Sequence, residues 1–519
     1  MRPTRERLLR KGDYVHGSFV KPESVDGYIN AVNPGDRSDV LGRFPFSVRN
    51  VDEAVESAAI GARAWRRVGL MERAAAVRRF REQFGRHQDD AAHLLTRETG
   101  KPLWEARQEA TAAIRSVDLF LDDGLGLIAP RVIEEIGGRA DYVPRGVVGV
   151  VNPYVMPLLQ AVQTTVAAVM GGNAVVMKPS KFTPAVGQHV AEMWDRCKLP
   201  RGVVNMVHGS GSVVGQKLVA HHGLDALVFA GGYDTARDIR RALIDRPEAP
   251  VLLQCGGKGI AIVLDDAEID RAVYEVLVGA CLSTGQRPNT TARVIVTAKI
   301  YEKFAGELVR RAQRITVGYG LTPDTFMGPL ISENARLRFR KYCRAVVSKG
   351  HSPLLEGDAV DVPNYRGNYV RPGIYRVHWE NGLAFLNDEP PGPILLVYRV
   401  KDVEEAVNVH NRAMYRPVTS VFTRLESPAL VELRDTLRTG AINVNRATVG
   451  ASMRLPSVAQ GRSANGLAGG MELMRMMTYP RASLVETRAF DSSQLVPGVS
   501  WHDEETSEEP ESVMELAVE

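Results

Sequence analysis

The sequence predicts an α/β protein in which a helical segment precedes two blocks of parallel βαβ units. Apolar residues in the segment from 51 to 120 recur at steps of three and four, which is typical of helices with one buried face. These residues are Val55, Ala58, Ala62, Trp65, Val77, Phe80 and Phe84. From Gly146 onward, short apolar runs alternate with helix-length segments, which is the pattern of a parallel sheet.

Short apolar runs mark the expected strands of the first block, and each is separated from the next by enough residues for a crossover helix. They lie at 147–151, 174–177, 203–207 and 226–229. A second block of the same kind runs from about Val251 to Asn445. A chain of 519 residues with 44% hydrophobic residues can bury more than one core, so two or three domains are expected.

Charge and cysteine usage exclude several classes of function. The formal net charge of +4 is small for this length and the basic residues are spread along the chain, so we expect neither a nucleic-acid nor a membrane partner. No apolar run of about 18 residues occurs and the first residues do not resemble a signal peptide, which favours a cytoplasmic location. The four cysteines form no CxxC pair, so we expect reduced thiols and no metal site.

Several motifs follow one another in a fixed order between about residues 14 and 501. They include Glu98-Thr99-Gly100-Lys101-Pro102, Pro153-Tyr154-Val155-Met156-Pro157, Met177-Lys178-Pro179-Ser180, Gly209-Ser210-Gly211, Leu253-Gln254-Cys255-Gly256-Gly257-Lys258, Gly285-Gln286-Arg287 and Glu389-Pro390-Pro391-Gly392-Pro393. In this order they resemble the aldehyde dehydrogenase family. Within it, Asn443-Val444-Asn445-Arg446 and Pro480-Arg481-Ala482-Ser483-Leu484 resemble most the succinylglutamate semialdehyde dehydrogenases.

The resemblance implies a domain plan. It implies a Rossmann-like cofactor domain, a catalytic-type α/β domain and a small β arm for oligomerisation, and hence a homodimer or a dimer of dimers. The corresponding ranges are 14–125 with 146–250 for the first domain, 251–445 for the second, and 126–145 with 478–490 for the arm. The arm strands are expected near Val132–Val143 and Ser483–Arg488.

The same resemblance implies that the catalytic positions are substituted. Pro288 stands where the family has its nucleophilic cysteine, so no heteroatom can attack a carbonyl there. Proline also lacks the backbone N–H that the family uses for the oxyanion. The second oxyanion donor, an asparagine side chain, is replaced by Val155. Losing one such donor typically costs about 3 to 4 kcal/mol of transition-state stabilisation.

The general base of the family is a glutamate, and Gln254 takes its place. A neutral amide cannot accept the proton, and a positioned base typically contributes about 10²- to 10⁴-fold in rate. No catalytic position of the family is therefore intact. Thr290 and Thr291 lack an evident base, and Cys255 and Cys281 are better explained as buried thiols than as replacement nucleophiles.

The nucleotide-binding positions implied by the resemblance are better kept. Lys178 matches the lysine that holds the adenosine ribose, Glu389 the glutamate on the nicotinamide ribose, and Gly209 and Gly211 the turn before a helix. Lys181 replaces a family glutamate beside the ribose. This change either favours NADP over NAD or weakens NAD binding.

The phosphate-contacting serine of the family is also replaced, in this case by Gly232, and only helix-end amides remain there. The cofactor, NAD or NADP, is therefore expected to bind more weakly than in the family. Lys181 tips the expectation slightly toward NADP.

Three functions remain open at this point. The first is an inactive family member, a pseudoenzyme, that binds, senses or regulates. The second is an NAD(P)-dependent oxidoreductase that acts by altered chemistry on a substrate resembling succinylglutamate semialdehyde, with Arg287 and Arg446 holding the acidic substrate. The third is an interaction protein that uses the dimer surface and a disordered acidic tail, residues 503–519, to hold a protein partner.

Overall fold

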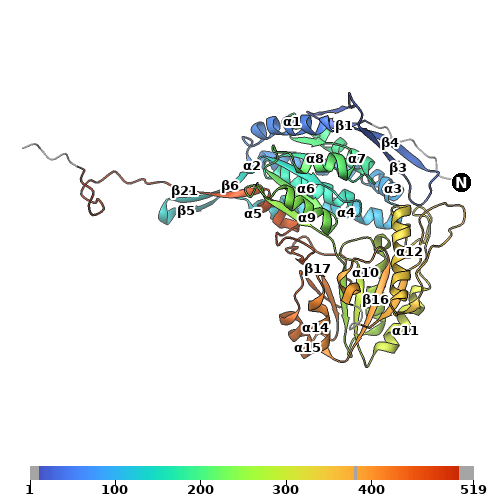
Figure 1. Cartoon of the computed structure of the whole chain (residues 1–519). Coiled ribbons are helices and arrows are strands. Elements are labelled where there is room, and N and C mark those ends of the chain that lie inside the picture. Colours follow the sequence, from blue (N-terminus) through green and yellow to red (C-terminus); the bar gives the residue numbers. More distant parts are fainter. Residues whose placement is uncertain (1–10, 379–382, 502–519) are drawn as a thin grey trace, which may run out of the picture. The chain divides into compact units, whose positions relative to one another are not determined.

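The computed structural model describes residues 11–378 and 383–501 (Figure 1). The chain divides into two compact units. The larger lies within Met1–Ala129 and Tyr142–Pro480, and the smaller within Pro130–Asp141 and Arg481–Glu519. The expected acidic tail at 503–519 lies outside the described residues. No helix in the described ranges is long and apolar enough to cross a membrane.

The first sheet of the larger unit has seven strands in the order β11-β10-β7-β8-β9-β1-β2. Its parallel strands are β7 (Val147–Val151), β8 (Ala174–Lys178), β9 (Val204–Met206), β10 (Ala226–Ala230) and β11 (Val251–Gln254). Antiparallel β1 (Asp13–Val15) and β2 (Ser18–Val20) form one edge. Strand β11 therefore belongs to this sheet, on the other side of the predicted boundary at 250/251, because it pairs with β10.

Helices cover both faces of this sheet because successive side chains of a strand point to opposite faces. Val148 and Val150 of β7 join one core with α6 (Pro157–Met170) and α7 (Pro184–Asp195). Val147 joins the other core with α1 (Arg49–Trp65), α8 (Gln216–Val219) and α9 (Tyr233–Ala242). Both faces are thus buried, as an all-apolar parallel strand requires.

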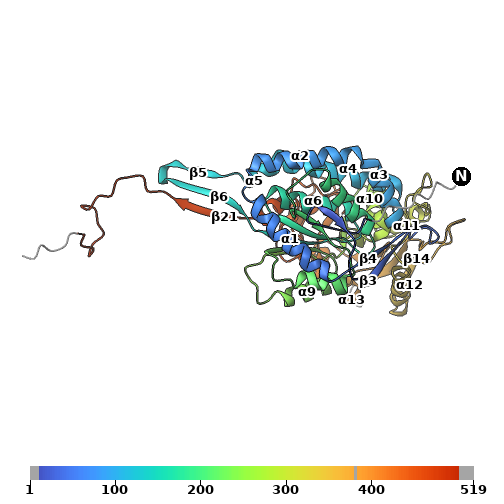
Figure 2. The same ribbon diagram turned by 90° about the horizontal axis from the view of Figure 1, so that it is seen from above.

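The helical segment predicted for residues 51–120 is confirmed. It forms α1, α2 (Leu70–Arg86), α3 (Gln88–Thr99) and α4 (Leu103–Leu119), preceded by the hairpin β3 (Gly27–Val32) and β4 (Val40–Phe46). Every residue of the predicted stripe, from Val55 to Phe84, is buried. Figure 2 shows α2, α3 and α4 as an outer layer, and α2 and α4 pack on α6. A π-helical turn (Phe120–Gly124) and α5 (Leu125–Leu127) follow.

The second sheet also has seven strands, in the order β14-β15-β16-β13-β12-β18-β19. They are β12 (Gly259–Val263), β13 (Thr291–Thr297), β14 (Ser352–Leu355), β15 (Gly373–Val377), β16 (Ile394–Val400), β18 (Thr419–Phe422) and β19 (Ile442–Val444). All pairings are parallel except that of β14. A second parallel α/β sheet is thus present as predicted, but it begins at Gly259 and not at Val251.

The helices of this block again pack on the two faces of their sheet. They are α10 (Ile269–Cys281), α11 (Tyr301–Ala312), α12 (Glu333–Ser348), α13 (Leu383–Asn387), α14 (Val403–Arg412) and α15 (Pro428–Thr436). Residues of α10 and α11 share one core, and residues of α12 and α14 share the other. Two short strands, β17 (Tyr415–Arg416) and β20 (Gln460–Gly461), pair with each other, and the short helix α16 (Leu473–Met476) follows them along the chain.

A separate three-stranded sheet has the order β21-β6-β5. It consists of β5 (Arg131–Ile133), β6 (Gly138–Pro144) and β21 (Thr478–Leu484). The single strand expected at 132–143 is thus a hairpin, because Gly137 adopts a left-handed turn at φ 57°. The strand expected at 483–488 begins earlier and ends at Leu484. Use of this sheet for oligomerisation stays a prediction.

Candidate functional site

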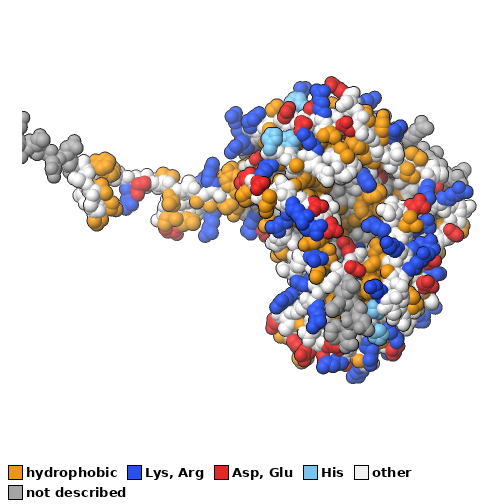
Figure 3. All heavy atoms as spheres, in the orientation of Figure 1, with side chains coloured by type: hydrophobic (Ala, Val, Ile, Leu, Met, Phe, Trp, Pro, Cys, Tyr) orange, Lys and Arg blue, Asp and Glu red, His pale blue; other side chains and the backbone are white. Residues whose placement is uncertain are grey.

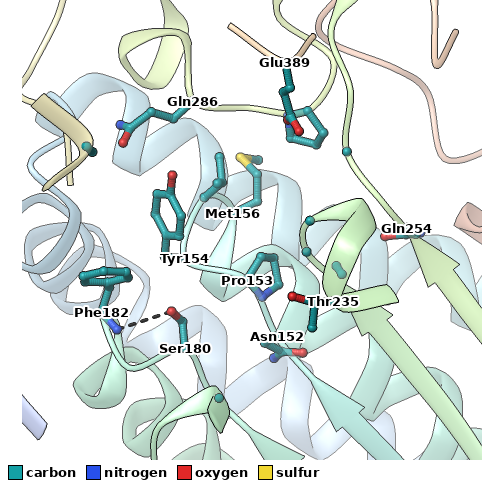
Figure 4. A pocket seen from close by; sticks show the side chains of 18 of the residues that line it. Asn152, Pro153, Tyr154, Met156, Ser180, Phe182, Thr235, Gln254, Gln286 and Glu389 are labelled. Carbon is teal, nitrogen blue, oxygen red and sulfur yellow. Dashed lines mark hydrogen bonds between the residues drawn. The ribbon is translucent and has the colours of Figure 1, made fainter. Parts of the chain in front are cut away.

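A cavity of about 510 Å³ lies at the carboxyl ends of the first sheet, and residues of both α/β blocks line it (Figure 4). From the first block it takes residues after β7, β8, β10 and β11; from the second it takes the loops around Pro288 and Glu389. Ligands of open α/β sheets bind outside the carboxyl ends of the strands. The cavity is therefore the candidate site, and the predicted positions Gln254, Pro288 and Val155 all line it.

Pro288, the predicted nucleophile position, lies on the loop between α10 and β13. The loop turns sharply because Ser283, Thr284 and Gly285 all adopt left-handed backbone angles, with φ of 49°, 55° and 66°. At Gly285 a Cβ atom would lie 2.4 Å from the backbone of Gly392, so this position requires glycine. The loop therefore presents residue 288 to the cavity, and that residue supplies neither a heteroatom nor an N–H group.

A buried ion pair between Arg287 and Glu105 fixes this loop to α4. Arg287 Nη2 lies 2.7 Å from Glu105 Oε1 on α4, and Glu105 also accepts a hydrogen bond from the backbone N–H of Ser283 at 3.1 Å. Burial raises the pKa of Glu105, but Arg287 and Lys101 outweigh burial and hold that pKa below its ordinary value. Arg287 is thereby directed toward α4 and does not line the cavity, in contrast to the predicted substrate contact.

One turn further along α4, Glu109 fixes the loop that carries Val155. It forms an ion pair with Lys101 and accepts hydrogen bonds from the backbone N–H groups of Leu158 and Leu159, at 3.0 and 3.2 Å, at the start of α6. Lys101 also donates to the carbonyl of Val155 at 3.0 Å. No sequence motif indicated these roles for Glu105 and Glu109, although their spacing of four residues on a predicted helix places them on one face.

The side-chain amide of Gln254, at the end of β11, already accepts a hydrogen bond. Gln160 Nε2 donates to Gln254 Oε1 at 3.3 Å, and a Cβ atom at Gly469 would lie 2.6 Å from Gln254 Nε2. Figure 4 shows Gln254 at the margin of the cavity. A neutral amide that already accepts a hydrogen bond cannot act as a general base.

The alternative nucleophiles are occupied or buried. The Thr290 hydroxyl donates to the carbonyl of Arg287 at 2.8 Å and accepts from Lys258 at 3.1 Å, and the Thr291 hydroxyl pairs with that of Thr448 at 2.9 Å. Burial raises the pKa of Cys255 to about 11 and that of Cys281 to about 12. Neither thiol lines the cavity, so neither Cys255 nor Cys281 replaces the missing nucleophile.

The part of the cavity near Gly211 and Gly232, here called the nucleotide half, has room for a ligand beside the backbone. Gly211 and Gly232 line it, and a Cβ atom at either would meet nothing within 4 Å, so there is room beside the backbone for a ligand. Gly232 directly precedes α9, whose first N–H groups have no partner within the helix. Gly209 instead packs closely, because a Cβ atom there would lie 2.2 Å from Val214.

Lys178 ends β8 and is almost fully buried, with 3% of its surface exposed. Its ammonium group donates to the carbonyls of Pro179 and Gly209, at 2.9 and 3.1 Å. Burial, followed by the nearby charge of Lys181, lowers the pKa of Lys178 to about 8. Lys181 is exposed, lies 5.2 Å from the ring centre of Phe182, and has no carboxylate within ion-pair distance in the described ranges.

Two further groups complete the polar lining. Glu389 is exposed and accepts the backbone N–H of Gly257 at 3.3 Å. Asn152, at the end of β7, is buried at 6% exposure, and its side-chain Nδ2 has no hydrogen-bond partner among the described residues. A buried donor without an acceptor costs about 1 to 3 kcal/mol, so an acceptor on a ligand would be stabilising at this atom. The sequence did not single out Asn152, because an asparagine after a strand carries no specific signal.

These groups fit a nicotinamide dinucleotide. The two open glycine positions and the start of α9 can accept a pyrophosphate, Lys178 and Lys181 bring two ammonium groups to the lining, and Glu389 can accept from ribose hydroxyls. Arg446, the second predicted substrate contact, is exposed after β19 and lies outside the lining of this cavity. The described residues contain no cluster of His, Cys, Asp and Glu that could hold a metal.

Comparison with known proteins agrees with this geometry. Residues 19–482 match the model of the aldehyde dehydrogenase family. The chain is 31% identical over 449 residues to an alpha-ketoglutaric semialdehyde dehydrogenase of Bacillus subtilis, covering 86% of this chain and 91% of the relative. It is 32% identical over 486 residues to an N-succinylglutamate 5-semialdehyde dehydrogenase of Chromobacterium violaceum, covering 90% and 95%.

Solved structures give the same result. Lactaldehyde dehydrogenase from Escherichia coli superposes with a TM-score of 0.85 at 26% identity, over 92% of this chain and 99% of that one. A 1-pyrroline-5-carboxylate dehydrogenase from Thermus, solved with bound NAD, gives 0.85 at 25% identity, over 91% and 92%. The fold, the cavity and both kinds of comparison lead to one conclusion: the chain belongs to the aldehyde dehydrogenase family.

Proposed function

We propose that this protein is a non-catalytic member of the family that binds a nicotinamide dinucleotide and acts by sensing or regulation. The observation that carries the proposal is that Pro288 lines the cavity; the resemblance assigns to this residue the position of the nucleophile. Aldehyde oxidation in the family requires a thiolate that adds to the carbonyl carbon before hydride leaves. A proline ring offers no lone pair for that addition.

The other contacts around the cavity support the same function. Val155 and Pro288 provide neither oxyanion donor, and the amide of Gln254 is held by Gln160. The nucleotide half, in contrast, keeps open backbone positions and the unpartnered Nδ2 of Asn152. A binding role uses what is present, whereas aldehyde oxidation would need a nucleophile and a base at the positions of Pro288 and Gln254, and neither residue supplies one.

The proposed ligand is NADP rather than NAD. Lys181 has no carboxylate partner in the described ranges, and it lies three residues after Lys178, close enough to lower the pKa of that lysine. Two ammonium groups at this position favour a ligand with an additional phosphate over one with a free ribose hydroxyl.

We further propose a homodimer, or a dimer of dimers, formed through β5, β6 and β21. Val132, Ile136 and Leu484 are exposed there to 59%, 60% and 73%. Exposed apolar strands of this kind are typical of interfaces. The proposed location is the cytoplasm, which suits four unpaired, buried cysteines.

A thermal-shift titration with NAD⁺, NADP⁺ and their reduced forms tests the binding. Ligand at about 100 times its Kd should stabilise the protein by roughly 2.7 kcal/mol. We expect the largest shift with NADP⁺ or NADPH, and a smaller one for Lys178→Met. Lys217→Met, which removes a surface lysine paired with Asp52 at 2.9 Å, is the matched control.

An activity assay tests the catalytic half of the proposal. Purified protein with NADP⁺ and succinic semialdehyde, or a longer ω-carboxylated aldehyde, should form no NADPH above the protein-free rate. Turnover that disappears in Gln254→Ala would instead establish the alternative, an oxidoreductase of altered chemistry.

A further inference from the structure

The charged residues that line the dinucleotide cavity are mostly cationic. They are Lys178, Lys181, Lys258, Arg338 and Glu389, that is, four basic side chains and one carboxylate. The N-terminus of α9, which begins directly after Gly232, adds the positive end of a helix dipole. Figure 3 shows a hollow between the two α/β blocks with lysine and arginine side chains at its edge. The electrostatic potential inside the cavity is therefore positive.

Three of the cations suit the phosphates of a dinucleotide. Lys181 and Arg338 are exposed, and neither has a carboxylate within ion-pair distance in the part of the chain that the structure describes. Lys178 has a pKa of about 8 and is mainly protonated at pH 7. Phosphates are common to the oxidised and the reduced cofactor, so these three groups do not distinguish the two forms.

The fourth cation lies behind the loop of Pro288. Lys258 is 3% exposed, and its ammonium group donates to the carbonyls of Gly285 and Arg287 at 2.5 and 3.1 Å. It also donates to the hydroxyl of Thr290 at 3.1 Å. Burial lowers the pKa of Lys258 to about 8, so this group is mainly protonated at pH 7. A buried positive charge thus faces the part of the cavity around Pro288 and Gln254, here called the reacting half.

The reacting half offers little negative charge in return. The resemblance assigns an ionisable cysteine to position 288 and a glutamate to position 254, but Pro288 and Gln254 are neutral. The phenol of Tyr154 is neutral as well, because burial raises its pKa to about 12. Glu389 is the one carboxylate of the described lining, and it is exposed and already accepts a backbone N–H group.

The two oxidation states of the cofactor differ in charge at the nicotinamide ring. The oxidised ring is a cation, whereas the reduced ring is neutral. The ring is bonded to the ribose that Glu389 holds under the proposed function, so the ring belongs to the reacting half. A positive potential between neutral walls raises the free energy of a bound cation and leaves that of a neutral ring almost unchanged.

We infer that the cavity binds the reduced dinucleotide in preference to the oxidised one, so that its occupancy follows the redox state of the nucleotide. Lys258, together with the neutral residues Gln254 and Pro288, sets this preference. The inference rests on the proposed function, because it requires a dinucleotide in this cavity. It involves no hydride transfer, only a difference in affinity between two forms of one ligand.

Fluorescence and calorimetric titrations of the full-length protein with NADPH and NADP⁺ test the preference. We expect NADPH to bind roughly tenfold more tightly or better. NADH should exceed NAD⁺ by a similar factor, because the effect resides in the ring and not in the 2′-phosphate. A preference confined to the phosphorylated pair would overturn the assignment to the ring.

Variants that change only the charge of the reacting half sharpen the test. Gln254→Glu adds a carboxylate there and should lower the NADPH preference roughly tenfold. Gln254→Met is the matched control, because it has a similar size and no charge, and it should keep the ratio of the parent. Pro288→Asp adds a carboxylate on the other loop and serves as the second charged variant if Gln254→Glu does not fold.

Three outcomes overturn the inference. Equal affinities for NADPH and NADP⁺, or a preference for NADP⁺, would show that the cations do not act on the ring, while the proposed nucleotide binding would stand. A preference that the folded charged variants leave unchanged would have the same meaning. Absence of binding by all four nucleotides would instead overturn the proposed function, and this inference with it.

Discussion

The two halves of the main cavity differ in what they offer a ligand. Around Pro288 and Gln254 the two residues supply neither a nucleophile nor a carboxylate base, yet the loops beside them are held by Glu105 and Glu109 of α4. Around Gly211 and Gly232, the binding surface is open and a buried donor lacks an acceptor. A fixed scaffold at Pro288 and an open surface at the two glycines therefore coexist within one cavity, which is the arrangement that the proposed binding role requires.

Restoring the missing groups tests this contrast most severely. The triple variant Pro288→Cys/Gln254→Glu/Val155→Asn should form reduced nicotinamide from an aldehyde, because the two loops are already positioned. The double variant Pro288→Cys/Val155→Asn, which keeps Gln254 and so lacks the base, should be slower than the triple variant by roughly 10²- to 10⁴-fold. Absorbance of the reduced cofactor is the measurement. A folded triple variant that binds nucleotide but stays inactive would mean that the reacting half has lost more than these groups.

Breaking the ion pair beneath the loop tests the scaffold. Glu105→Gln leaves the buried Arg287 uncompensated and should lower the free energy of unfolding by about 3 to 5 kcal/mol. Denaturant unfolding measures this. The double variant Glu105→Gln/Arg287→Met should recover part of the loss, and a double variant no more stable than the single one would show that the uncompensated charge is not the cause.

The same pair predicts a pH dependence. The folded pKa of Glu105 is depressed, so its contribution to stability is present above its unfolded pKa and is lost as pH falls through the folded value. Between about pH 5 and pH 3 the stability advantage of the wild type over Glu105→Gln should shrink. Parallel denaturant curves at the two pH values provide the measurement, and an advantage that grows would contradict the assigned direction.

Reversing the charge of Lys181 tests whether this residue sets the preference for NADP over NAD. Lys181→Glu should reduce NADP⁺ affinity about tenfold and leave NAD⁺ affinity equal or higher, because a carboxylate repels a phosphate and accepts from a hydroxyl. Calorimetry with both nucleotides measures the ratio. Lys217→Glu is the surface control, and an unchanged ratio for Lys181→Glu would place the phosphate elsewhere.

The smallest expected effect concerns Lys178. Its pKa of about 8 means that the ammonium group loses its proton as pH rises through that value, and a ligand anion is then held less firmly. NADP⁺ affinity should therefore fall by a few-fold between about pH 7 and pH 9. In Lys178→Met this pH dependence should be absent, and its persistence would assign it to another group.

The sequence alone determined most of the elements, their order and the family. The reason is that helical and strand periodicity is local and that motifs such as Leu253–Lys258 lie within a few residues of one another. Tertiary structure decided the rest. The local sequence presents Arg287 as a free cation beside Pro288, but a glutamate 182 residues earlier neutralises it. The strand Val251–Gln254 joined the first sheet because its pairing partner, not its own composition, sets its place. The unpartnered Nδ2 of Asn152 likewise exists only once distant segments pack together, since burial and neutralisation depend on neighbours that no local pattern specifies.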